Sequence, residues 1–539
     1  MEYVTNKNNV SFIKKTLDCI DENHIDIMSA FFSMGIGLLR QNGIYEKKHV
    51  AKVLAEYSDI PVDEELSNLV LPKDEFDILG LLYQSYLQEG DKNIAGSYYT
   101  PQKIACNMTK DFAFSNGELF FDPCCGSGAF LLSAAVRHPN QLFGVDSDRI
   151  AVFVAKLNLL VKYSDIEFEP QIYCLDYLMG YSVIQPHPVF LKCFDYIATN
   201  PPWGGMDNRW CDVDAITSNE TFSCFFVKAY DQLKASGTIR YLFPEAILNV
   251  KVHKDIRKFI IEKAGLISIT IYDDVFSGVM TKYVDIKCGK DIGNREFSVY
   301  ADGRKWNIDI RTIYETDNLI FNLLSNDDLS IVRMAKEKGK YFLRDSVWGL
   351  GIVTGDNKRK LFPEYHDGME MIYTGKEIQP YTLKQARYYI LFNRAELQQV
   401  AKDEVYRAQE KLVYKFISNR LVFAYDASQS LFLNSANILV PSIPGMSIKT
   451  VMAFLNSDLF QFLYLKLFGE VKILKGNLAE LPFPEISVDM DKKISELVDA
   501  VLNGETAKRD DIESIIFAIF GFSDEQKNYI RRNVNGKTD

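Results

Sequence analysis

Four short apolar segments, each ending in a polar or glycine-rich stretch, constrain the fold of this chain more than any other feature. The segments end at or lead into Asp122, Asp146, Asp176 and Asn200. Short apolar runs bounded by turn residues are typical of buried strands. The carboxyl ends of parallel strands meet at one edge of a sheet, where α/β proteins bind ligands. The sequence therefore predicts a doubly wound parallel sheet with a ligand crevice along that edge.

The first of these segments, residues 120–132, combines a strand end, a glycine-rich turn and the start of a helix. Gly126 and Gly128 allow the backbone to come close to a ligand, and the helix start offers free N–H groups. Asp146 follows about 20 residues after the glycines, where the ribose of a nucleoside needs an acceptor for its hydroxyls. This spacing favours a nucleoside-containing cofactor.

The fourth segment runs into Asn200-Pro201-Pro202-Trp203. The side-chain oxygen of Asn200 and the backbone oxygen of Pro201 are acceptors, and two rigid prolines can hold them so that they converge on one NH2 group. Trp203 offers a flat apolar face for a base. The tetrapeptide therefore favours chemistry on a planar amino nitrogen. By itself it also fits a proline-stiffened surface turn with the Trp in a core.

Three motifs in this order resemble the gamma-class adenine-N6 DNA methyltransferases: GSYYTP at residues 96–101, DPCCGSG at 122–128 and NPPW at 200–203. In that family the S-adenosylmethionine motifs precede the catalytic motif, and a target recognition domain follows both. The resemblance covers roughly residues 75 to 485. The chain departs from the usual pattern at Cys124, where the family has a small residue.

The resemblance implies S-adenosylmethionine as the cofactor and a role for each matching residue. The catalytic turn would be Asn200, Pro201, Pro202 and Trp203, with Trp203 and Phe276 stacking on a flipped adenine. The cofactor would lie against Tyr99, Thr100, Asp122, Pro123, Gly126, Gly128, Asp146, Asp176 and Tyr177. Within that set, Asp146 would take the ribose hydroxyls, Asp176 the adenine amino group, and Tyr177 would be a stacking face.

Purely structural roles remain possible for several of these positions. Asp146 and Asp176 could each be a cap at a strand end. Phe276 precedes an apolar strand, and a phenylalanine in such a place is more often part of a core.

The charge of the chain is distributed unevenly. The net charge is -11, which is unusual for a protein that contacts phosphates. Residues 331–480 contain 21 Lys and Arg against 15 Asp and Glu, a local charge of +6, so the remainder carries 40 against 57, or -17. We therefore expect double-stranded DNA as the partner of this region, although a solvated surface explains any single lysine equally well. The candidate contacts are Lys411, Lys415, Arg420, Lys472 and Lys475.

Length and patterning suggest several domains, because 539 residues exceed one typical domain. We expect an α/β, Rossmann-like methyltransferase sheet with an N-terminal helical segment and a C-terminal mixed α+β recognition domain. The expected parts are a helical segment at 1–74, the catalytic domain at 75–310, a linker at 311–339, the DNA target recognition domain at 340–485 and a helical tail at 486–539.

The predicted function is site-specific transfer of a methyl group from S-adenosylmethionine to N6 of a flipped adenine in double-stranded DNA, as the modification part of a restriction-modification or phage-defence system. The alternatives are a methyltransferase acting on RNA or on a protein glutamine, and a DNA-binding specificity module. The large C-terminal extension argues against the former, and the intact cofactor motifs argue against the latter. An endonuclease would be on a separate chain, since no segment is long enough to build a nuclease domain.

No metal centre and no membrane segment are expected. The nine cysteines contain no C-x-x-C pair, and the six histidines have no H-E-x-x-H spacing. The N-terminal residues lack a signal-peptide core, and no apolar run reaches about 18 residues. A cytoplasmic location follows as an expectation.

Overall fold

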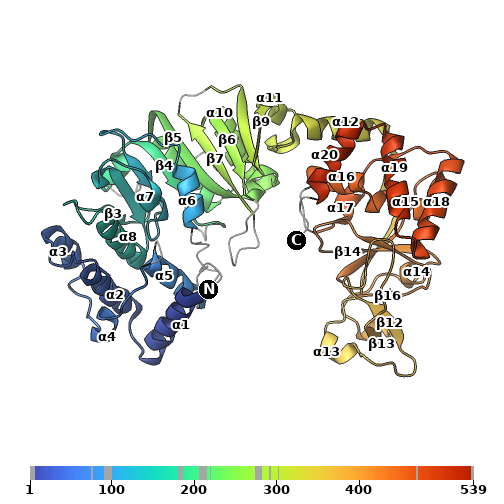
Figure 1. Cartoon of the computed structure of the whole chain (residues 1–539), viewed down its shortest axis with the longest axis horizontal. Coiled ribbons are helices and arrows are strands. Elements are labelled where there is room, and N and C mark those ends of the chain that lie inside the picture. Colours follow the sequence, from blue (N-terminus) through green and yellow to red (C-terminus); the bar gives the residue numbers. More distant parts are fainter. Residues whose placement is uncertain are drawn as a thin grey trace. The chain divides into compact units, whose positions relative to one another are not determined.

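The computed structural model describes residues 7–73, 77–89, 100–179, 186–205, 215–218, 220–272, 282–290, 293–301, 303–468 and 472–535. The chain divides into two compact units, Met1–Leu323 and Leu324–Asp539 (Figure 1). The division falls within residues 311–339, the expected linker. Each unit has hydrophobic cores of its own.

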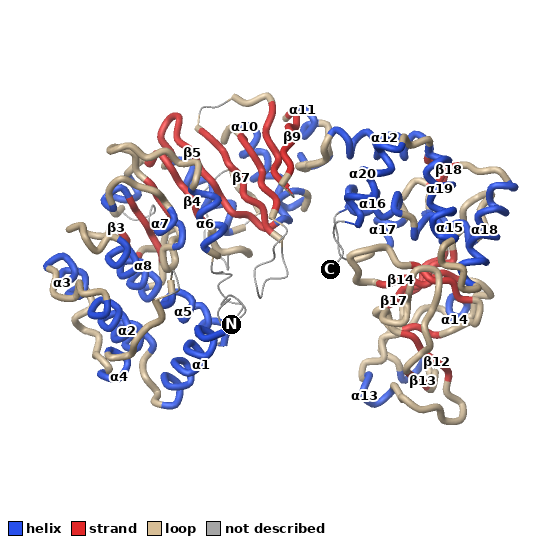
Figure 2. Tube along the Cα trace, in the orientation of Figure 1, coloured by secondary structure: helices blue, strands red, loops and turns tan. Residues whose placement is uncertain are grey.

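The first unit contains a nine-stranded sheet with helices on both faces (Figure 2). Its strands are β1 (Phe120–Asp122), β2 (Leu142–Asp146), β3 (Gln171–Cys174), β4 (Phe194–Thr199), β5 (Leu233–Pro244), β6 (Leu266–Ile271), β7 (Tyr283–Gly289), β8 (Glu296–Ala301) and β9 (Arg304–Asp309). Its helices are α1 (Lys7–Glu22), α2 (Ile27–Gln41), α3 (Lys48–Ala55), α4 (Glu64–Ser67), α5 (Ile78–Glu89), α6 (Gln102–Thr109), α7 (Ala129–Ser133), α8 (Arg149–Lys162), α9 (Thr221–Asp231), α10 (Lys254–Glu262) and α11 (Arg311–Tyr314).

The strand order is β3-β2-β1-β4-β5-β7-β6-β8-β9. Strands β3, β2, β1, β4 and β5 are parallel, whereas β7 is antiparallel to both β5 and β6. From β1 the chain first adds β2 and β3 on one side and then returns to add β4 and β5 on the other. This reversal places the ligand crevice of a doubly wound sheet between β1 and β4. The predicted fold class is confirmed.

Alternation along each strand divides the core into two layers. Phe120 packs in one cluster with residues of α6, α7 and α8, and its neighbour Phe121 packs in the other with residues of α9 and α10. Successive side chains of a strand point to opposite faces, and a parallel sheet is buried on both. The strands have nearly continuous apolar sequences because helices cover both faces of the sheet.

The N-terminal helices belong to the first of these layers. Helix α2 starts after Asp26, whose side chain accepts a hydrogen bond from the amide of Ser29 (3.0 Å). It then packs so closely on α8 that a Cβ at Gly35 would lie 2.5 Å from Leu157 and 2.8 Å from Phe153. The helical prediction for this segment is confirmed, and its core is continuous with that of the sheet.

The second unit is a mixed α+β structure, as predicted for the recognition domain. Its strands are β10 (Gly339–Tyr341), β11 (Val347–Leu350), β12 (Glu370–Tyr373), β13 (Tyr388–Ile390), β14 (Lys411–Lys415), β15 (Phe423–Asp426), β16 (Leu431–Phe432), β17 (Ala436–Val440) and β18 (Phe483–Pro484). Its helices are α12 (Asn326–Lys338), α13 (Asn357–Lys360), α14 (Asp403–Tyr406), α15 (Ile448–Asn456), α16 (Asp458–Phe468), α17 (Lys475–Leu478), α18 (Val488–Leu502), α19 (Lys508–Phe520) and α20 (Asp524–Asn535).

The strands of the second unit form separate small sheets. The largest has the order β11-β17-β14-β15 and is antiparallel throughout, and the next is β13-β12-β16. Helices α15, α16, α18, α19 and α20 share one core with one face of the larger sheet. The C-terminal helical tail is thus built into this unit.

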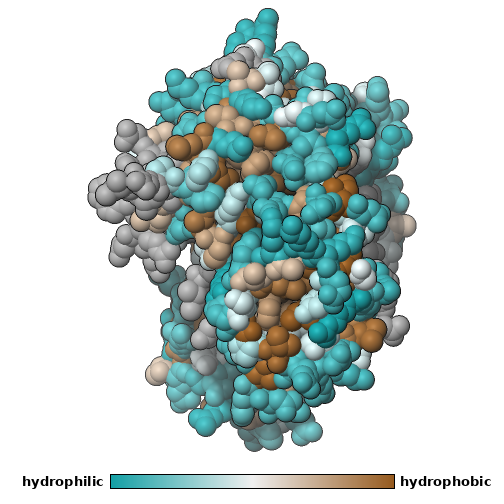
Figure 3. All heavy atoms as spheres, turned by 90° about the vertical axis from the view of Figure 1, so that its left-hand side faces the viewer, coloured by the Kyte–Doolittle hydropathy of each residue, from teal (hydrophilic) through white to brown (hydrophobic). Residues whose placement is uncertain are grey.

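Within the described residues, no single helix is both long and apolar enough to cross a membrane; α15 and α16 reach that composition only together, across a bend of 63°. Both helices are largely buried in the core of the second unit. The face of the first unit drawn in Figure 3 is mostly hydrophilic, with apolar residues gathered in separate patches.

Candidate active site

The crevice between β1 and β4 brings together residues from three distant parts of the sequence. Asp122 ends β1, Asp146 ends the neighbouring β2, and Asn200 directly follows β4. In the strand register, Asp122 lies opposite Gly144, and Phe121 lies opposite Ile197. The motif residues that the sequence analysis selected therefore lie at one edge of the sheet.

The glycine-rich turn, residues 122–128, has the open shape that a nucleoside cofactor requires. Gly126 and Gly128 have φ values of 50° and 97°, a region that side-chain-bearing residues rarely adopt. A Cβ on Gly126 would meet no described atom within 4 Å, so the space above the turn is free of them. Gly128 also forms the start of α7, whose first amide groups lack helical partners.

Asp146 is held at the bottom of this turn by backbone groups. Its two carboxylate oxygens accept hydrogen bonds from the amides of Gly126 (2.8 Å) and Asp148 (3.0 Å). Burial raises the pKa of Asp146, and these two hydrogen bonds act in the opposite direction. A carboxylate has capacity for further donors beyond these two. Asp146 therefore shapes the turn and can also accept from a ligand hydroxyl.

Asp122 lies beneath the same turn and is fully buried. One of its oxygens accepts a hydrogen bond from the amide of Cys124 (3.1 Å). Burial raises the pKa of this carboxyl to about 7, against the effects of the Thr199 hydroxyl and the Cys124 amide. Pro123 is also buried. Both residues are therefore placed to shape the turn, and neither offers an exposed surface.

Asp176 and Tyr177 fit their predicted roles differently: Asp176 is half-buried and its contact with the adenine amino group stays a prediction, whereas Tyr177 is buried. Asp176 accepts hydrogen bonds from the amides of Leu178 (3.0 Å) and Met179 (3.1 Å), as a cap does. Tyr177 is 2% exposed, and its ring stacks on Phe225 with centroids 5.3 Å apart. The stacking role predicted for Tyr177 is wrong, because its ring faces are covered by the core between the sheet and α9.

The catalytic turn presents a buried acceptor. Asn200 is 9% exposed, and its Nδ2 donates a hydrogen bond to the hydroxyl of Thr100 (3.2 Å). Among the described residues its Oδ1 has no hydrogen-bond partner, although it is buried. Buried acceptors without a donor are rare and costly, so this atom is suited to a ligand that brings an N–H group.

The remaining residues of the turn surround that acceptor. Pro201 is buried, while Pro202 and Trp203 are half-buried, and the Trp203 ring packs at the margin of both cores of the unit. Thr100, predicted to contact the cofactor, is 7% exposed and contacts Asn200. Tyr99 and Phe276 lie outside the described residues.

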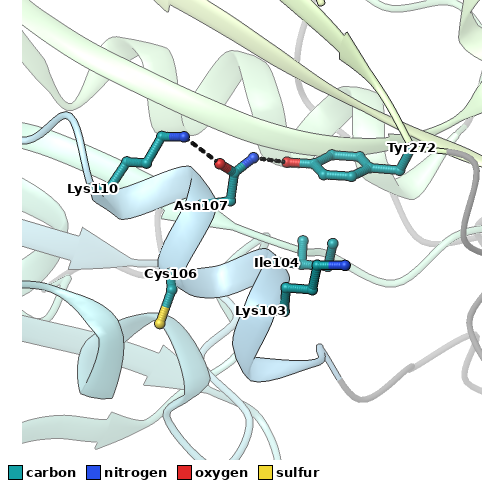
Figure 4. Close-up of a pocket in the computed structure, with 6 residues that line it drawn as sticks. All are labelled: Lys103, Ile104, Cys106, Asn107, Lys110 and Tyr272. Carbon is teal, nitrogen blue, oxygen red and sulfur yellow. Dashed lines mark hydrogen bonds between the residues drawn. The ribbon is translucent and has the colours of Figure 1, made fainter. Parts of the chain in front are cut away.

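A pocket of about 470 Å³ lies along α6, the helix that begins just after Thr100 (Figure 4). Asn107 spans it, because its Nδ2 donates to the Tyr272 hydroxyl (2.7 Å) and its Oδ1 accepts from Lys110 (2.6 Å). Arg240 of β5 donates to the Asn107 carbonyl oxygen (2.8 Å), which holds α6 against the sheet. The full lining is Lys103, Ile104, Cys106, Asn107, Lys110 and Tyr272.

Sequence reasoning missed several residues that support this site. Asn107 and Tyr272 are 165 residues apart, and no local pattern links them. Asp77, just before α5, and Asn158 of α8 both form hydrogen bonds with Ser127 of the glycine-rich turn. The one signal in the sequence was a polar Asn158 within the apolar run of α8.

One of the predicted DNA contacts is wrong. Lys411 is fully buried in β14, where its Nζ pairs with Asp426 (2.6 Å) and donates to the Tyr406 carbonyl oxygen (2.6 Å). Asp426 lies directly opposite Lys411 in the strand register. This ion pair satisfies the buried charge, so Lys411 cannot reach a phosphate.

The other candidate cations differ in their surroundings. Arg420 is paired with Asp458 (3.1 Å). Lys472 and Lys475 are exposed and Lys415 is half-buried, and none of the three forms an ion pair within the described parts of the chain. The amide of Ile473 donates to the Phe416 carbonyl oxygen (2.8 Å), which brings Lys472 close to Lys415. Lys415, Lys472 and Lys475 therefore remain as candidate DNA contacts.

No group of three or more possible metal ligands occurs in the portions of the chain that are described.

Two family models match the chain. Residues 74–329 match the N-6 DNA Methylase family, and residues 370–483 match the TaqI-like C-terminal specificity domain. Together with the doubly wound sheet and its glycine-rich turn, these two matches identify the chain as an S-adenosylmethionine-dependent DNA methyltransferase. Its two matched parts are similar to the N-6 DNA methylases and to TaqI-like specificity domains, respectively.

Relatives with similar sequences are enzymes of restriction-modification systems. The chain is 28% identical over 344 residues to Type II methyltransferase M.VspI of Vibrio sp. (strain 343), covering 61% of this chain and 82% of the relative. It is 24% identical over 247 residues to Type II restriction enzyme and methyltransferase RM.BcgI of Heyndrickxia coagulans, covering 42% and 36%. It is 29% identical over 147 residues to the Type I restriction enzyme MjaIX methylase subunit of Methanocaldococcus jannaschii, covering 25% and 24%. The alignments with RM.BcgI and the MjaIX subunit thus span less than half of the length of each relative.

Solved structures share the fold across both units. The type IIG restriction endonuclease BpuSI matches with a TM-score of 0.50 and 12% identity, covering 96% of this chain and 80% of that one. The Type IIL restriction-modification enzyme MmeI, solved in complex with DNA, matches with a TM-score of 0.55 and 13% identity, covering 88% and 83%. At this level of identity the likeness concerns the fold alone.

Proposed function

We propose that this chain methylates N6 of a flipped adenine in double-stranded DNA, at a sequence read by its specificity domain. The observation that carries the proposal is the buried Oδ1 of Asn200, which has no donor among the described residues and lies at the cofactor crevice. An exocyclic amino group would supply the missing N–H. The amino group of a paired adenine is engaged in the duplex, so the base has to rotate out to reach this atom.

The glycine-rich turn fits S-adenosylmethionine, because Gly126 leaves its space open and Asp146 can accept from ribose hydroxyls. When bound, this cofactor supplies a methyl group already activated on a sulfonium. Asn200 and the carbonyl oxygen of Pro201 would accept the two amino hydrogens and orient the nitrogen lone pair towards that methyl group. As positive charge develops on the nitrogen, both oxygens stabilise it. Catalysis then consists of alignment and charge stabilisation, without a strong base.

Trp203 would hold the flipped base. Its ring is half-buried, which fixes its orientation while leaving part of the surface accessible. Stacking of a base on an aromatic ring is worth roughly 1–3 kcal/mol, comparable with the cost of a few kcal/mol for taking the base out of the duplex.

DNA is favoured over RNA or a protein glutamine by the specificity domain in residues 370–483. Relatives named as a methyltransferase, a methylase subunit and a combined restriction enzyme and methyltransferase suggest a modification role. We place this role in the cytoplasm. The associated endonuclease would be a separate protein that acts on unmethylated sites.

The proposal is tested by sequencing the methylome of cells that express the chain, beside cells that express Asn200→Ala. N6-methyladenine at one short motif, absent with the variant, is the expected result. Cytosine methylation at that motif would replace adenine as the target. Methylation of RNA or protein without any DNA motif would overturn the proposal.

A further inference from the structure

Asp77 is a buried carboxylate outside every motif of the catalytic turn or the glycine-rich turn. It lies directly before α5 and is 2% exposed. Its Oδ1 accepts a hydrogen bond from the amide of Gly80 in the first turn of that helix (2.8 Å). A helix start on the surface needs only a solvated cap, so the complete burial of this one requires another explanation.

The partners of Asp77 come from two other elements. Its Oδ2 accepts a hydrogen bond from the Ser127 hydroxyl, and its Oδ1 accepts one from Nδ2 of Asn158 in α8 (2.7 Å). The same Nδ2 donates to the carbonyl oxygen of Ser127 (3.0 Å). Ser127 is thus held by both its side chain and its backbone.

The fit around this network is close. A Cβ on Gly80 would lie 2.0 Å from Oδ2 of Asp77 and 2.5 Å from Oγ of Ser127. Any larger residue at position 80 would therefore separate Asp77 from Ser127. Here the glycine serves the approach of two polar groups, because its φ is not among the positive values.

Ser127 is the residue between Gly126 and Gly128 in the cofactor turn. Both glycines have left-handed φ values and lose more conformational freedom on ordering than other residues do. Burial raises the pKa of Asp77, while the hydrogen bonds that its carboxyl accepts from Ser127, Asn158 and Gly80 act in the opposite direction. Because Ser127 lies between Gly126 and Gly128, fixing it restricts the conformations of the whole turn before a ligand binds.

We propose that Asp77, together with Asn158, is a positioning residue that preorganises the glycine-rich turn for S-adenosylmethionine through Ser127. The proposal depends on the cofactor site of the proposed function and extends it to α5. Preorganisation lowers the ordering cost of binding, so it affects cofactor affinity more than the rate of methyl transfer.

The test compares Asp77→Asn, Ser127→Ala and the double variant with the full-length chain. Calorimetry should show S-adenosylmethionine bound roughly three- to tenfold more weakly by each single variant, as expected for losing one buried hydrogen bond. The double variant should bind no more weakly than the weaker single one, because both remove one interaction. The kcat at saturating cofactor should change by less than about threefold while KM rises.

Ser133→Ala is the matched control, since it removes a hydroxyl from α7 that bonds only to Ala129 and Cys106 among the described residues. Its affinity should equal that of the unchanged chain. If the Asp77 variant does not fold, Ser127→Ala still decides the matter. A folded Ser127→Ala with unchanged affinity overturns the proposal, and so does an additive double variant.

Failure of the proposed function would look different. A chain that binds S-adenosylmethionine through this network but leaves DNA adenine unmodified would refute the substrate and keep the role of Asp77.

Discussion

Asn200 combines two properties that rarely occur together, a nearly complete burial and an acceptor without a donor among the described residues. Asn200→Ala removes this acceptor while leaving the glycine-rich turn intact. We expect methyl transfer to fall by about 10²–10³, as for the loss of one transition-state hydrogen bond. Cofactor affinity, measured by calorimetry, should stay within about twofold, because Asn200 does not belong to the residues that form the turn.

Asn200→Asp is the informative companion, because it keeps the shape and the Oδ1 acceptor and loses the donor to Thr100. Partial activity in this variant would assign the main role to Oδ1. Near-normal turnover in the alanine variant would mean that Asn200 is not catalytic.

Asp122 makes stability depend on pH. Its pKa rises from the ordinary value of 3.8 to about 7 on folding, so the folded chain binds a proton that the unfolded chain releases. This contribution is fully present below pH 3.8 and is lost as the pH rises through 7. Asp122→Asn stays neutral, so its free energy of unfolding should decline less between pH 4 and 7, by up to a few kcal/mol at about 1.4 kcal/mol per pKa unit.

Urea titrations at several pH values would measure this difference. Asp18→Asn, at an exposed position of α1, is the control and should follow the pH profile of the unchanged chain. Parallel profiles for Asp122→Asn and the unchanged chain would show that the carboxyl is not the source of the dependence.

Residues whose role lies in a contiguous motif could be predicted from the sequence, and those whose role depends on a distant partner could not. Gly126 and Asn200 stand in short patterns that carry their own geometry. Lys411 reads as a surface cation until β15 places Asp426 opposite it. Tyr177 follows a strand like a ligand-binding residue, and only the packing of α9 shows that its ring is covered.

At the scale of elements, the end of β14 and the stretch that leads into α17 carry the remaining candidate DNA contacts, Lys415, Lys472 and Lys475. Neutralising Lys472 or Lys475 should weaken DNA binding across sequences and lower the salt slope by about one unit for each phosphate that the variant no longer neutralises. Lys411→Met should leave the slope unchanged and lower stability instead, because it leaves Asp426 buried without its partner. Fluorescence anisotropy at several salt concentrations, with thermal denaturation alongside, separates the two effects.

These assignments would be wrong if Lys411→Met altered the salt slope of DNA binding and the variants of the exposed lysines left that slope unchanged. In that case the DNA would bind a different surface of the second unit.

Strand and helix types were predictable where the periodicity is strong. The apolar strands β1 to β4 and the helix at Thr221–Asp231 can be predicted directly from the sequence. The extension of the sheet by β8 and β9 was not predicted: β8 alternates between buried and more exposed residues, but its partner β9 buries only Ile308. The packing of the helices before α5 could not be predicted either, because it depends on the close approach of Gly35 to α8.

For the whole molecule, the two units have separate cores, so each should fold alone. A chain ending at Leu323 should bind S-adenosylmethionine and gain about 2.7 kcal/mol of stability at a hundredfold excess over Kd. It should lose site-specific methylation of DNA, because the specificity domain lies in the second unit. Methylation of the same motif at the same rate by this shorter chain would show that sequence is read elsewhere.

The hydrogen bond from Asn200 to Thr100 joins residues 100 positions apart, and it carries a consequence for how the molecule matures. Closing so long a loop costs entropy that only a nearly complete sheet can offset, so interactions of this kind form late in folding. Helices and hairpins can form while the chain is still unable to catalyse methyl transfer. The fraction of chains competent for methyl transfer should therefore report how many molecules have completed the sheet, and active-site titration of freshly refolded protein would measure that fraction.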